Sequence, residues 1–540
     1  LTSFELIFFG FLFVKAFTIN QRNINFGYLG LYGMLLSILI SYLSNFLIAH
    51  NHLFNSLYFI IGLGSFIFLL KELKFSNVKK DLIFSFYLFL ILFISVLIFK
   101  NHDDFPYYHF EYTYILTQFD LLVGLGQFNH GFKTPSSIFY LNSLYYLPLI
   151  EYYSFNFAQT FILGFANFIF FKKIKILNNN SPSENFLSFY SLLCLIFINI
   201  FFYRIAEHGT DRSAQIIALL LIGEILFLIR SHKNMIASYF SVYAFLTFIV
   251  SLKSFYILYL IFLLPLYYHN IKLLNFNEFV KKHFYQKYII FLFFIFLFSL
   301  LSYFFSTGCF IYPLKFTCIE NLSWAMKVDQ IDAMYIHYEK WAKSVTGVQF
   351  SLDNPNYYIQ NFNWVSNWVE KYFFNKVSDF LLGLLFLITI VNFSFYKISN
   401  KFQNIFLNKY QVFLFLLIVV LTIEWFYNHP SLRYGGYNLI ALIFIIPSSL
   451  FLSTLTLNVK KVSNLSVIFI CITIVIFLGR NINRIDKEIK LYNYNPFKNA
   501  FYSTNDDHFN EYNDILENIN NYKNDNKSTK KLFGKYIFLN

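Results

Sequence analysis

Residues 82–99 have the sequence LIFSFYLFLILFISVLIF, an apolar run without a charged side chain. An apolar helix of about 17–25 residues is long enough to cross the hydrocarbon core of a bilayer. Similar runs recur along the chain, and together they predict about fourteen membrane-spanning helices. Their approximate ranges are 3–19, 26–49, 53–70, 82–99, 155–171, 186–203, 213–229, 235–250, 255–268, 289–305, 379–396, 411–427, 437–456 and 465–479.

The composition of the whole chain agrees with this pattern. The chain has 540 residues, of which 57% are hydrophobic and 13% are charged, and its mean hydropathy is +0.51. A soluble domain usually carries about 25% charged residues. These values exclude a water-soluble enzyme, a disordered chain and a disulfide-dense scaffold. We therefore expect an all-α integral membrane protein, a polytopic bundle of about 12–14 transmembrane helices.

The formal net charge is +13 at pH 7, which in a soluble protein would suggest a nucleic-acid partner. Here the basic residues are concentrated in short loops, for example at 71–80, 172–175 and 272–287, that fall on one side of the predicted spans. Loops rich in lysine and arginine remain in the cytoplasm. The pattern predicts a multi-pass protein of the bacterial inner (cytoplasmic) membrane that contacts membrane lipids and binds no nucleic acid.

The predicted spans divide the chain into a polytopic domain over residues 1–480 and a polar extracytoplasmic tail over residues 481–540. Two larger outer loops belong to the first part, at 100–153 and 306–378. In the first loop, apolar residues recur at roughly helical spacing over residues 107–128, among several glycines and prolines. This pattern predicts an interfacial helix followed by a re-entrant or surface segment.

The four cysteines fall into two groups. Cys194 and Cys471 lie within predicted spans, and we expect them to be packing residues. Cys309 and Cys318 lie close together in the second outer loop, on the oxidising side of the membrane. This position predicts a disulfide. Metal binding is the alternative, but no C-x-x-C motif or histidine lies nearby.

Charged residues next to helix ends are concentrated on the outer side, where an unpaired charge is costly. Such residues tend to pair with one another or with a ligand. Their sequences are NHDDFPYYH at 101–109, RIAEHGTDR at 204–212, SLKSFY at 251–256 and NHPSLRYGGY at 428–437.

Asp103 and Asp104 open the first outer loop. Adjacent carboxylates point in different directions and can serve two partners. One is a candidate general base for an acceptor hydroxyl, and the other could bind a divalent cation such as Mg²⁺ or Mn²⁺, or position a basic residue. His102 and His109 are candidates to complete a substrate-binding site. The alternative is that an aspartate caps the N-terminus of a helix.

Arg212, Lys253 and Arg433 lie at the outer ends of three different helices. If these helices are bundled, the three cations could converge on one anionic group, since arginine suits bidentate phosphate contacts and lysine a point-charge contact. His429 is a further substrate-binding candidate. The alternative is that these cations extend to lipid headgroups. Two neighbouring carboxylates are their candidate ion-pair partners: Glu207 and Asp211.

The region 101–148 resembles the first outer loop of GT-C-type membrane glycosyltransferases. The similar parts are the acidic pair Asp103-Asp104, the expected helix at 107–128, GLGQFNHG at 124–131 and TPSSIFYLNSLYYLP at 134–148. The resemblance implies a polyprenyl-phosphate-linked sugar donor, an outward-facing site and an acidic base, here Asp103 or Asp104. The cations that it implies for the lipid phosphate are Arg212, Lys253 and Arg433.

This chain departs from the GT-C pattern in one respect, because about four predicted spans precede the acidic loop rather than the usual single span. The segment TGCFIYPLKFTCIENLSW at 307–324 also resembles uncharacterised multi-pass bacterial membrane proteins, which supplies no activity.

The resemblance predicts a membrane glycosyltransferase for cell-surface glycan or glycoconjugate synthesis. Its partner would be a lipid-linked sugar donor, and the sugar, the acceptor and the oligomeric state are left open. The main alternative is a polytopic transporter or flippase for a lipid-linked or anionic substrate, in which Glu224, deep in a predicted span, would matter more than the aspartate pair. A polysaccharide polymerase or ligase is a further alternative with the same lipid-linked substrate.

Overall fold

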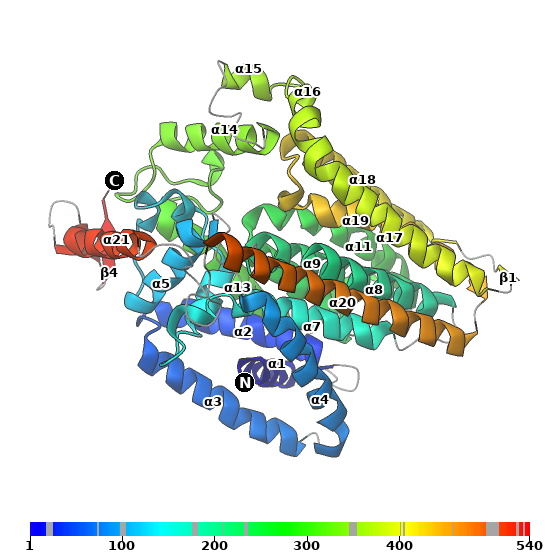
Figure 1. Cartoon of the computed structure of the whole chain (residues 1–540). Coiled ribbons are helices and arrows are strands. Elements are labelled where there is room, and N and C mark those ends of the chain that lie inside the picture. The colour runs from blue at the N-terminus through cyan, green and yellow to red at the C-terminus, as the bar shows by residue number, and fades with distance from the viewer. Residues whose placement is uncertain are drawn as a thin grey trace.

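A computed structural model of the chain is an elongated bundle of long helices (Figure 1). It describes residues 1–540 except 18–24, 73–74, 98–103, 175–181, 208, 232–235, 345–353, 400, 403–405, 457, 493–506, 525–528, 533–534 and 540.

The α-helices, in chain order, are α1 Thr2–Ala16, α2 Phe26–Asn45, α3 His52–Glu72, α4 Phe75–Leu92, α5 Phe110–Gln118, α6 Ser137–Ser143, α7 Phe157–Ile174, α8 Pro182–Phe201, α9 Gly209–Ser231, α10 Ile236–Leu252, α11 Leu263–Leu273, α12 Phe276–His283, α13 Lys287–Thr307, α14 Val328–Ser344, α15 Pro355–Ile359, α16 Val365–Trp368, α17 Ser378–Lys397, α18 Lys409–Asn428, α19 Gly436–Thr454, α20 Val459–Tyr492 and α21 Asp507–Asn524. The 3-10 and π-helical segments are η2 Phe93–Leu97, η3 Phe105–His109, η4 Leu125–Gln127, η5 His130–Lys133, η6 Glu151–Ser154, η7 Ser254–Phe262, η8 Lys315–Thr317, η10 Val369–Val377 and η11 Leu432–Tyr434.

Twelve helical segments in the described part of the chain are long and apolar enough to cross a membrane. Some are composite, such as Val365–Lys397, which joins α16, η10 and α17. The apolar part of α10, Ser238–Leu252, is shorter, and α1 has 15 residues. Each predicted span overlaps one of these helices, which confirms an all-α polytopic membrane protein. In hydrocarbon, only a helix satisfies every backbone polar group within its own segment.

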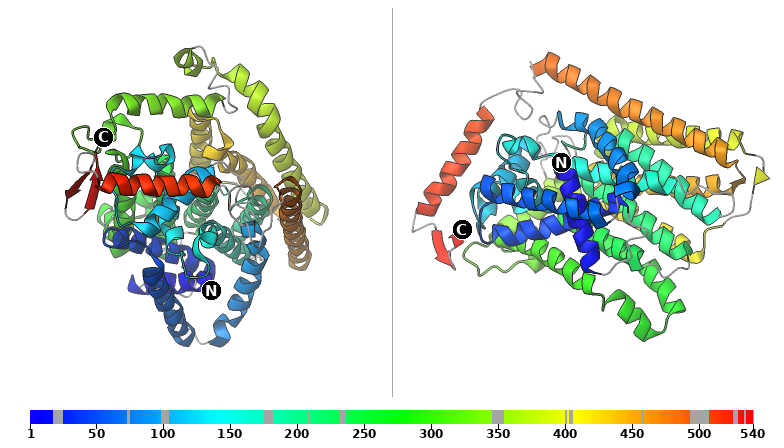
Figure 2. Two further views of the ribbon diagram at one scale, coloured as in Figure 1. Left: turned by 60° about the vertical axis from the view of Figure 1, so that its left-hand side comes forward. Right: turned by 90° about the horizontal axis from the view of Figure 1, so that it is seen from below.

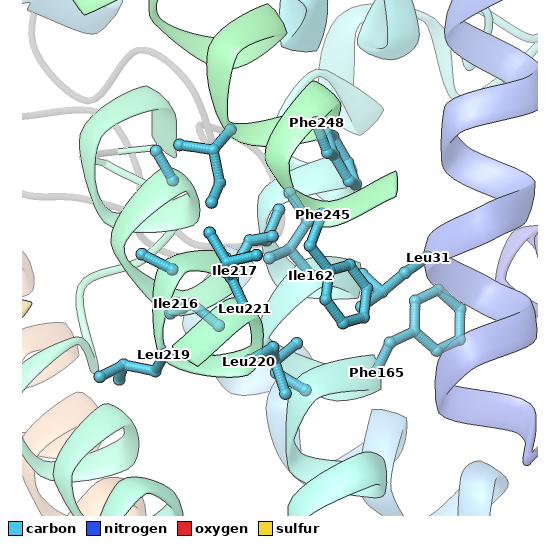
Figure 3. Packing of buried hydrophobic residues seen from close by; sticks show 14 of the residues in the cluster. Leu31, Ile162, Phe165, Ile216, Ile217, Leu219, Leu220, Leu221, Phe245 and Phe248 are labelled. Atoms are coloured by element: carbon cyan, nitrogen blue, oxygen red, sulfur yellow. The ribbon is translucent and has the colours of Figure 1, made fainter. Parts of the chain in front are cut away.

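The centre of the bundle is formed by α2, α7, α9 and α10 (Figure 3). In α9, Ile216 and Ile217 are fully buried, and Ile217 lies beside Ile162 of α7 and Phe245 of α10. By contrast, most side chains in the spanning part of α3 and of α4 are not buried against the rest of the protein. Figure 2 shows this pair of helices as a V at the edge of the bundle. Their open apolar faces fit contact with lipid.

Helices α1 and α2 cross at very close range because glycines lie at the crossing. A Cβ atom on Gly10 would lie 1.7 Å from the carbonyl oxygen of Leu29, and one on Gly33 would lie 1.8 Å from that of Leu6. Small residues let helix backbones approach in this way in membranes, where dispersion contacts drive association.

Two short antiparallel pairings of strands complete the described fold. Strand β1 (Lys401–Phe402) pairs with β2 (Leu455–Thr456) and ties the α17–α18 connection to the α19–α20 connection. Strand β3 (Thr529–Leu532) pairs with β4 (Lys535–Phe538) near the C-terminus. The β4 strand also bonds to the first outer loop, where Phe538 N–H donates to the carbonyl of Val123 at 2.9 Å.

The first outer loop contains a shorter helix than the one predicted over residues 107–128. The helical backbone ends at Gln118 after η3 and α5, and residue 119 is extended. The cause is tertiary: Leu121 N–H donates to the carbonyl of Asn45 at 2.8 Å, and Val123 N–H donates to that of Tyr536 at 3.1 Å. Gly124 then has a positive φ of 85°, which the absence of a Cβ permits.

The second outer loop contains the predicted disulfide between Cys309 and Cys318. Cys194 is buried, as expected of a packing residue, whereas Cys471 is exposed on α20. Helix α16 begins at Val365, inside the range predicted for this loop, and the domain boundary predicted at residue 480 lies within α20.

Candidate functional site

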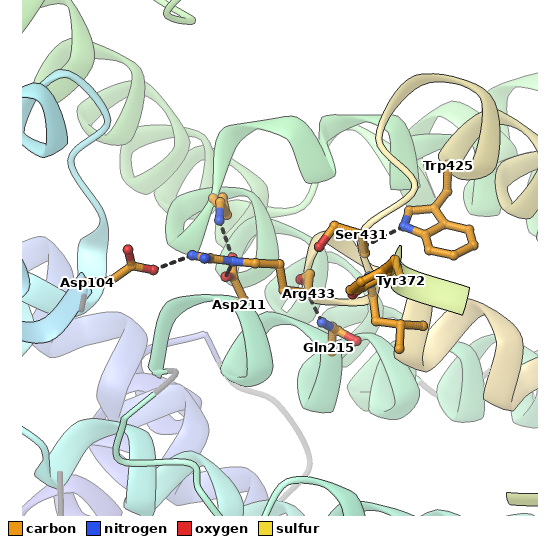
Figure 4. A network of polar contacts seen from close by, with 9 residues as sticks. Asp104, Asp211, Gln215, Tyr372, Trp425, Ser431 and Arg433 are labelled. Carbon is orange, nitrogen blue, oxygen red and sulfur yellow. Dashed lines mark hydrogen bonds and ion pairs between the residues drawn. The ribbon is translucent and has the colours of Figure 1, made fainter. Parts of the chain in front are cut away.

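Four charged side chains from distant parts of the sequence meet at one end of the bundle: Asp104, Asp211, Lys253 and Arg433, here called the charged cluster. Arg433 binds both carboxylates, with its Nη2 donating to Asp104 and its Nε donating to Asp211 at 3.0 Å (Figure 4). Lys253 donates to the second carboxylate oxygen of Asp211. The result is a continuous chain of alternating charges.

Each member of the charged cluster lies at or near the end of a helix. Asp104 immediately precedes η3, and Asp211 lies in the first turn of α9. Lys253 separates α10 from η7, and Arg433 lies in η11, between α18 and α19. Polar side chains are tolerated at such ends because the apolar cross-section of the bundle stops there.

The η11 turn that carries Arg433 is held by side chains of several helices. Gln215 of α9 donates to the Arg433 carbonyl at 2.9 Å. The indole N–H groups of Trp368 and Trp425 donate to the carbonyls of Pro430 and Ser431, each at 2.8 Å. These contacts fix the backbone of the turn, so Arg433 reaches the two aspartates from a rigid support.

Burial disfavours the positive charge of both Arg433 and Lys253, but the pKa values of the two side chains shift in opposite directions. For Arg433, the attraction of the carboxylates of Asp211 and Asp104 outweighs burial, and its pKa is raised well above the usual value. For Lys253, burial outweighs the attraction of Asp211, and its pKa is lowered. Lys253 also lies 4.9 Å from the centre of the Tyr434 ring, a cation–π contact.

Two tyrosines beside the charged cluster are neutral at physiological pH. Burial is the main cause that raises the pKa of Tyr434 to about 12, although Arg433 opposes it. Burial, followed by the charge of Asp104, raises the pKa of Tyr108 well above its usual range. Their hydroxyl groups can therefore donate hydrogen bonds to an oxygen of a ligand.

Helix α14 contacts His130 of the first outer loop through two residues that the sequence analysis did not single out. The His130 ring lies 5.5 Å from the ring of Tyr338 and 5.8 Å from that of His337, both on α14. Burial, followed by the charges of Lys133 and His337, lowers the pKa of His130 to about 4, while Asp104 opposes the shift. His130 lies in the GLGQFNHG segment quoted above, but no spacing in the sequence links that segment to α14.

Three of the predicted site residues, Asp104, Lys253 and Arg433, lie together in the charged cluster. Asp104 makes no side-chain hydrogen bond as a helix cap, so the cap alternative does not account for it. Lys253 and Arg433 are paired with carboxylates and their side chains are 24% and 31% exposed. These ion pairs explain the positions of the two cationic side chains better than an extension to lipid headgroups does.

The other predicted site residues lie elsewhere. Arg212 makes no ion pair with the aspartates of the charged cluster within the described residues, and its guanidinium lies 5.8 Å from the centre of the Phe202 ring. Successive residues of a helix point about 100° apart, so Arg212 and Asp211 leave α9 in different directions. His109 is buried with its ring 5.0 Å from that of Phe139.

His429 is exposed, with its ring 6.3 Å from that of Tyr434. Asp103 and His102 lie outside the described residues. Among the two candidate ion-pair partners, Asp211 joins the charged cluster, whereas Glu207 pairs with Arg204 and Arg484.

The described residues contain no group of three or more His, Cys, Asp or Glu side chains that could hold a metal ion. Asp104 and Asp211 are both bound by cationic side chains, an arrangement that does not fit a divalent cation. Two small cavities of about 10 Å³ lie elsewhere, one beside Lys173 and Gly223 and one beside Tyr42 and Phe298. Each has room for about one water molecule.

The fold and the charged cluster define a polytopic helical membrane protein with a charged site at one end of its bundle. The chain belongs to the family described as a domain of unknown function (DUF8201), whose model matches residues 1–440. This range includes every member of the charged cluster. Comparisons with curated proteins and with solved structures gave no match.

Proposed function

We propose that the protein is a membrane glycosyltransferase that transfers a sugar from a polyprenyl-phosphate-linked donor to an acceptor on the outer side of the membrane. The observation that carries the proposal is the charged cluster, in which two carboxylates and two cations from four separate segments lie within contact distance. Sugar transfer from such a donor needs a carboxylate as the base and cations for the phosphate at one place.

The reaction moves negative charge onto the phosphate. An acceptor hydroxyl loses its proton to a base, and its oxygen forms a bond to the anomeric carbon. The bond from that carbon to the phosphate oxygen breaks, and its electrons leave with the polyprenyl phosphate. The phosphate changes from a diester to a monoester and gains one negative charge, which Lys253 and Arg433 would stabilise.

Asp104 is the better candidate for the base. Its side chain is 23% exposed, whereas that of Asp211 is 6% exposed and contacts both cations. A base must be reachable by the acceptor hydroxyl. Asp211 would then orient Lys253 and Arg433, and Asp103, outside the described residues, remains the second candidate base. The neutral Tyr108 and Tyr434 hydroxyls would be donors to substrate oxygens.

The test compares Asp104→Asn with Asp120→Asn in membranes supplied with a radiolabelled polyprenyl-phosphate sugar. Asp120 is a suitable control because its side chain is also partly exposed, 32%, and also paired, with Lys535 at 2.6 Å. We expect the first variant to lose at least 100-fold in transfer and the second to keep it, since base catalysis contributes about 10²–10⁴-fold. Full transfer by Asp104→Asn would reject the base assignment.

A transporter or flippase is the second candidate, and one buried ion pair favours it. Glu224 of α9 is buried, pairs with Lys173 of α7 and accepts a hydrogen bond from the Tyr28 hydroxyl. Intramembrane charges of this kind often mark transport pathways. Loss of lipid-linked substrate movement in Glu224→Gln, with full retention in Asp104→Asn, would favour transport over sugar transfer.

A further inference from the structure

Helix α1 carries a glutamate, Glu5, whose side chain is enclosed where α1 meets α3. Helix α1 packs against both α2 and α3, and α3 lies on its outer side at the edge of the bundle (Figure 1). Glu5 is 0% exposed. A Cβ atom on Gly62 of α3 would lie 2.2 Å from the Cγ atom of Glu5 and 3.0 Å from its carboxyl carbon. The carboxyl group therefore occupies space that exists because Gly62 has no side chain.

The contact between Glu5 and Gly62 lies at the middle of a membrane span. Gly62 is the central residue of α3, a spanning helix of 21 residues. Ten residues further along each helix, Lys15 of α1 donates to Glu72 of α3 in an exposed ion pair. Ten residues of helix extend about 15 Å, half of a hydrocarbon core of about 30 Å. The carboxyl group of Glu5 is therefore near the level of the bilayer midplane.

Both carboxyl oxygens of Glu5 are buried without a hydrogen-bond partner among the described residues. Phe9, one turn further along α1, stacks on Tyr58 of α3 with the ring centres 5.0 Å apart. The Tyr58 hydroxyl is turned away from Glu5 and donates to a serine of α2. The other titratable groups within electrostatic range of Glu5 are the Tyr145 hydroxyl and the amino group of Leu1, and neither bonds to it.

Two other buried glutamates of the bundle show what a negative charge requires in this protein. Glu224 pairs with Lys173, and Glu207 pairs with two arginines. Glu5 makes no ion pair within the described part of the chain. An isolated carboxylate is far more costly to place in apolar surroundings than the neutral acid, and a group in this position takes up a proton instead. An ionisable side chain inside a membrane span commonly has a function.

We propose that Glu5 is an intramembrane proton-binding site, separate from the charged cluster and independent of the sugar-transfer proposal. Its carboxyl group holds a proton at neutral pH and keeps it until water reaches the contact between α1 and α3. Loss of the proton places a negative charge against α3, most of whose spanning side chains are not buried against the rest of the protein. Proton binding at Glu5 therefore stabilises the packing of α3 on the bundle.

The first test follows thermal unfolding of the full chain in a non-ionic detergent between pH 5 and pH 8. A glutamate in an unfolded chain loses its proton at about pH 4.3, so over this range unfolding releases the proton of Glu5. The unfolding equilibrium constant of the unaltered protein should therefore rise about tenfold per pH unit relative to that of Glu5→Gln.

Glu72→Gln is the matched control for this test. Glu72 lies on the same pair of helices, but its side chain is 46% exposed and paired with Lys15. The unaltered protein should gain no such pH dependence relative to Glu72→Gln. A ratio of unfolding constants between the unaltered protein and Glu5→Gln that is the same at every pH would overturn the proposal.

A second measurement needs no variant and serves if Glu5→Gln fails to fold. Dicyclohexylcarbodiimide, an apolar reagent, modifies carboxylic acids: the acid proton moves to a nitrogen of the reagent while a carboxyl oxygen bonds to its central carbon. An ionised carboxylate lacks this proton. Mass spectrometry of labelled membranes should show Glu5 modified about tenfold or more faster than Glu72 at pH 7, at a rate that is constant from pH 5 to pH 8. A rate at Glu5 that falls about tenfold per pH unit, as for a carboxyl group in water, would overturn the proposal.

Two alanine variants test the position of the carboxyl group. Gly62→Ala adds a methyl group that overlaps Glu5, whereas a Cβ atom on Gly64, two residues further along α3, would meet no atom within 4 Å. Gly62→Ala should lower the melting temperature and Gly64→Ala should not. Equal melting temperatures for the two variants would show that Glu5 does not lie against α3, and would also overturn the proposal.

Discussion

Replacing Asp211 by asparagine should destabilise the protein because it leaves two cations without their shared partner. The change keeps the shape of the side chain and removes its charge. Arg433 retains Asp104, but Lys253 loses the one carboxylate that it contacts among the described residues. Removing one partner of a buried ion pair typically costs about 3–5 kcal/mol.

The expected cost lies below that range because water reaches both cations. The side chains of Lys253 and Arg433 are 24% and 31% exposed, whereas that of Asp211 is 6% exposed. Partial solvation and the remaining contact with Asp104 reduce the loss to about 2–3 kcal/mol. This value can be measured as the free energy of unfolding in mixed micelles titrated with sodium dodecyl sulfate.

Two further variants make the measurement specific. Asp332→Asn removes a carboxylate whose partner, Lys315, is 3.2 Å away and about half exposed, so it should cost less than about 1 kcal/mol. Adding Lys253→Met to Asp211→Asn removes the orphaned charge, and the double variant should recover about 1–2 kcal/mol relative to additivity. The reasoning is refuted if Asp211→Asn unfolds like the unaltered protein, or if the two substitutions add without coupling.

Three other variants test the fold. His50 is fully buried between the hydroxyls of Ser143 and Ser44, and burial lowers its pKa to about 3. Because the pKa of histidine in the unfolded chain is about 6.5, the free energy of unfolding falls as the pH drops below 6.5, by about 2 kcal/mol at pH 5. His50→Gln should therefore lose this part of the pH dependence of the melting temperature. Gly10→Ala should cost about 1–3 kcal/mol or more in the titration with sodium dodecyl sulfate, because the new methyl group would overlap the α2 backbone. An unchanged midpoint of that titration would contradict the close α1–α2 crossing. Cys309→Ser opens a short disulfide loop, worth about 2–3 kcal/mol by chain entropy, and should accelerate proteolysis near residues 310–320 without lowering helix content; equal cleavage rates would show that the disulfide does not restrain the loop.

The predicted spans were located correctly because each depends on a local property. A run such as residues 82–97 satisfies its backbone hydrogen bonds internally, so its helical state does not depend on its neighbours. The first outer loop lacks this independence. Residues 119–124 continue a roughly helical pattern, yet the N–H groups at 121, 123 and 124 donate to the carbonyls of Asn45, Tyr536 and Phe305. These distant acceptors end the helix.

The candidate site was predicted in part. Charges at helix ends indicated Asp104, Lys253 and Arg433, because a charge next to an apolar run needs a partner. The role of Asp211 and the separation of Arg212 depend on the rotation of α9 about its axis. That rotation is set by how Ile217 and its neighbours pack against α7 and α10.

The amino-acid sequence by itself determined the class of the protein and the positions of its helices, since hydropathy acts over a single segment. Only the tertiary structure decided which charges meet. Arg433 and Asp104 are 329 residues apart, and Arg484 reaches Glu207 from the last long helix. Such pairs follow from which helices lie next to one another, and this arrangement depends on side-chain shape across the whole bundle.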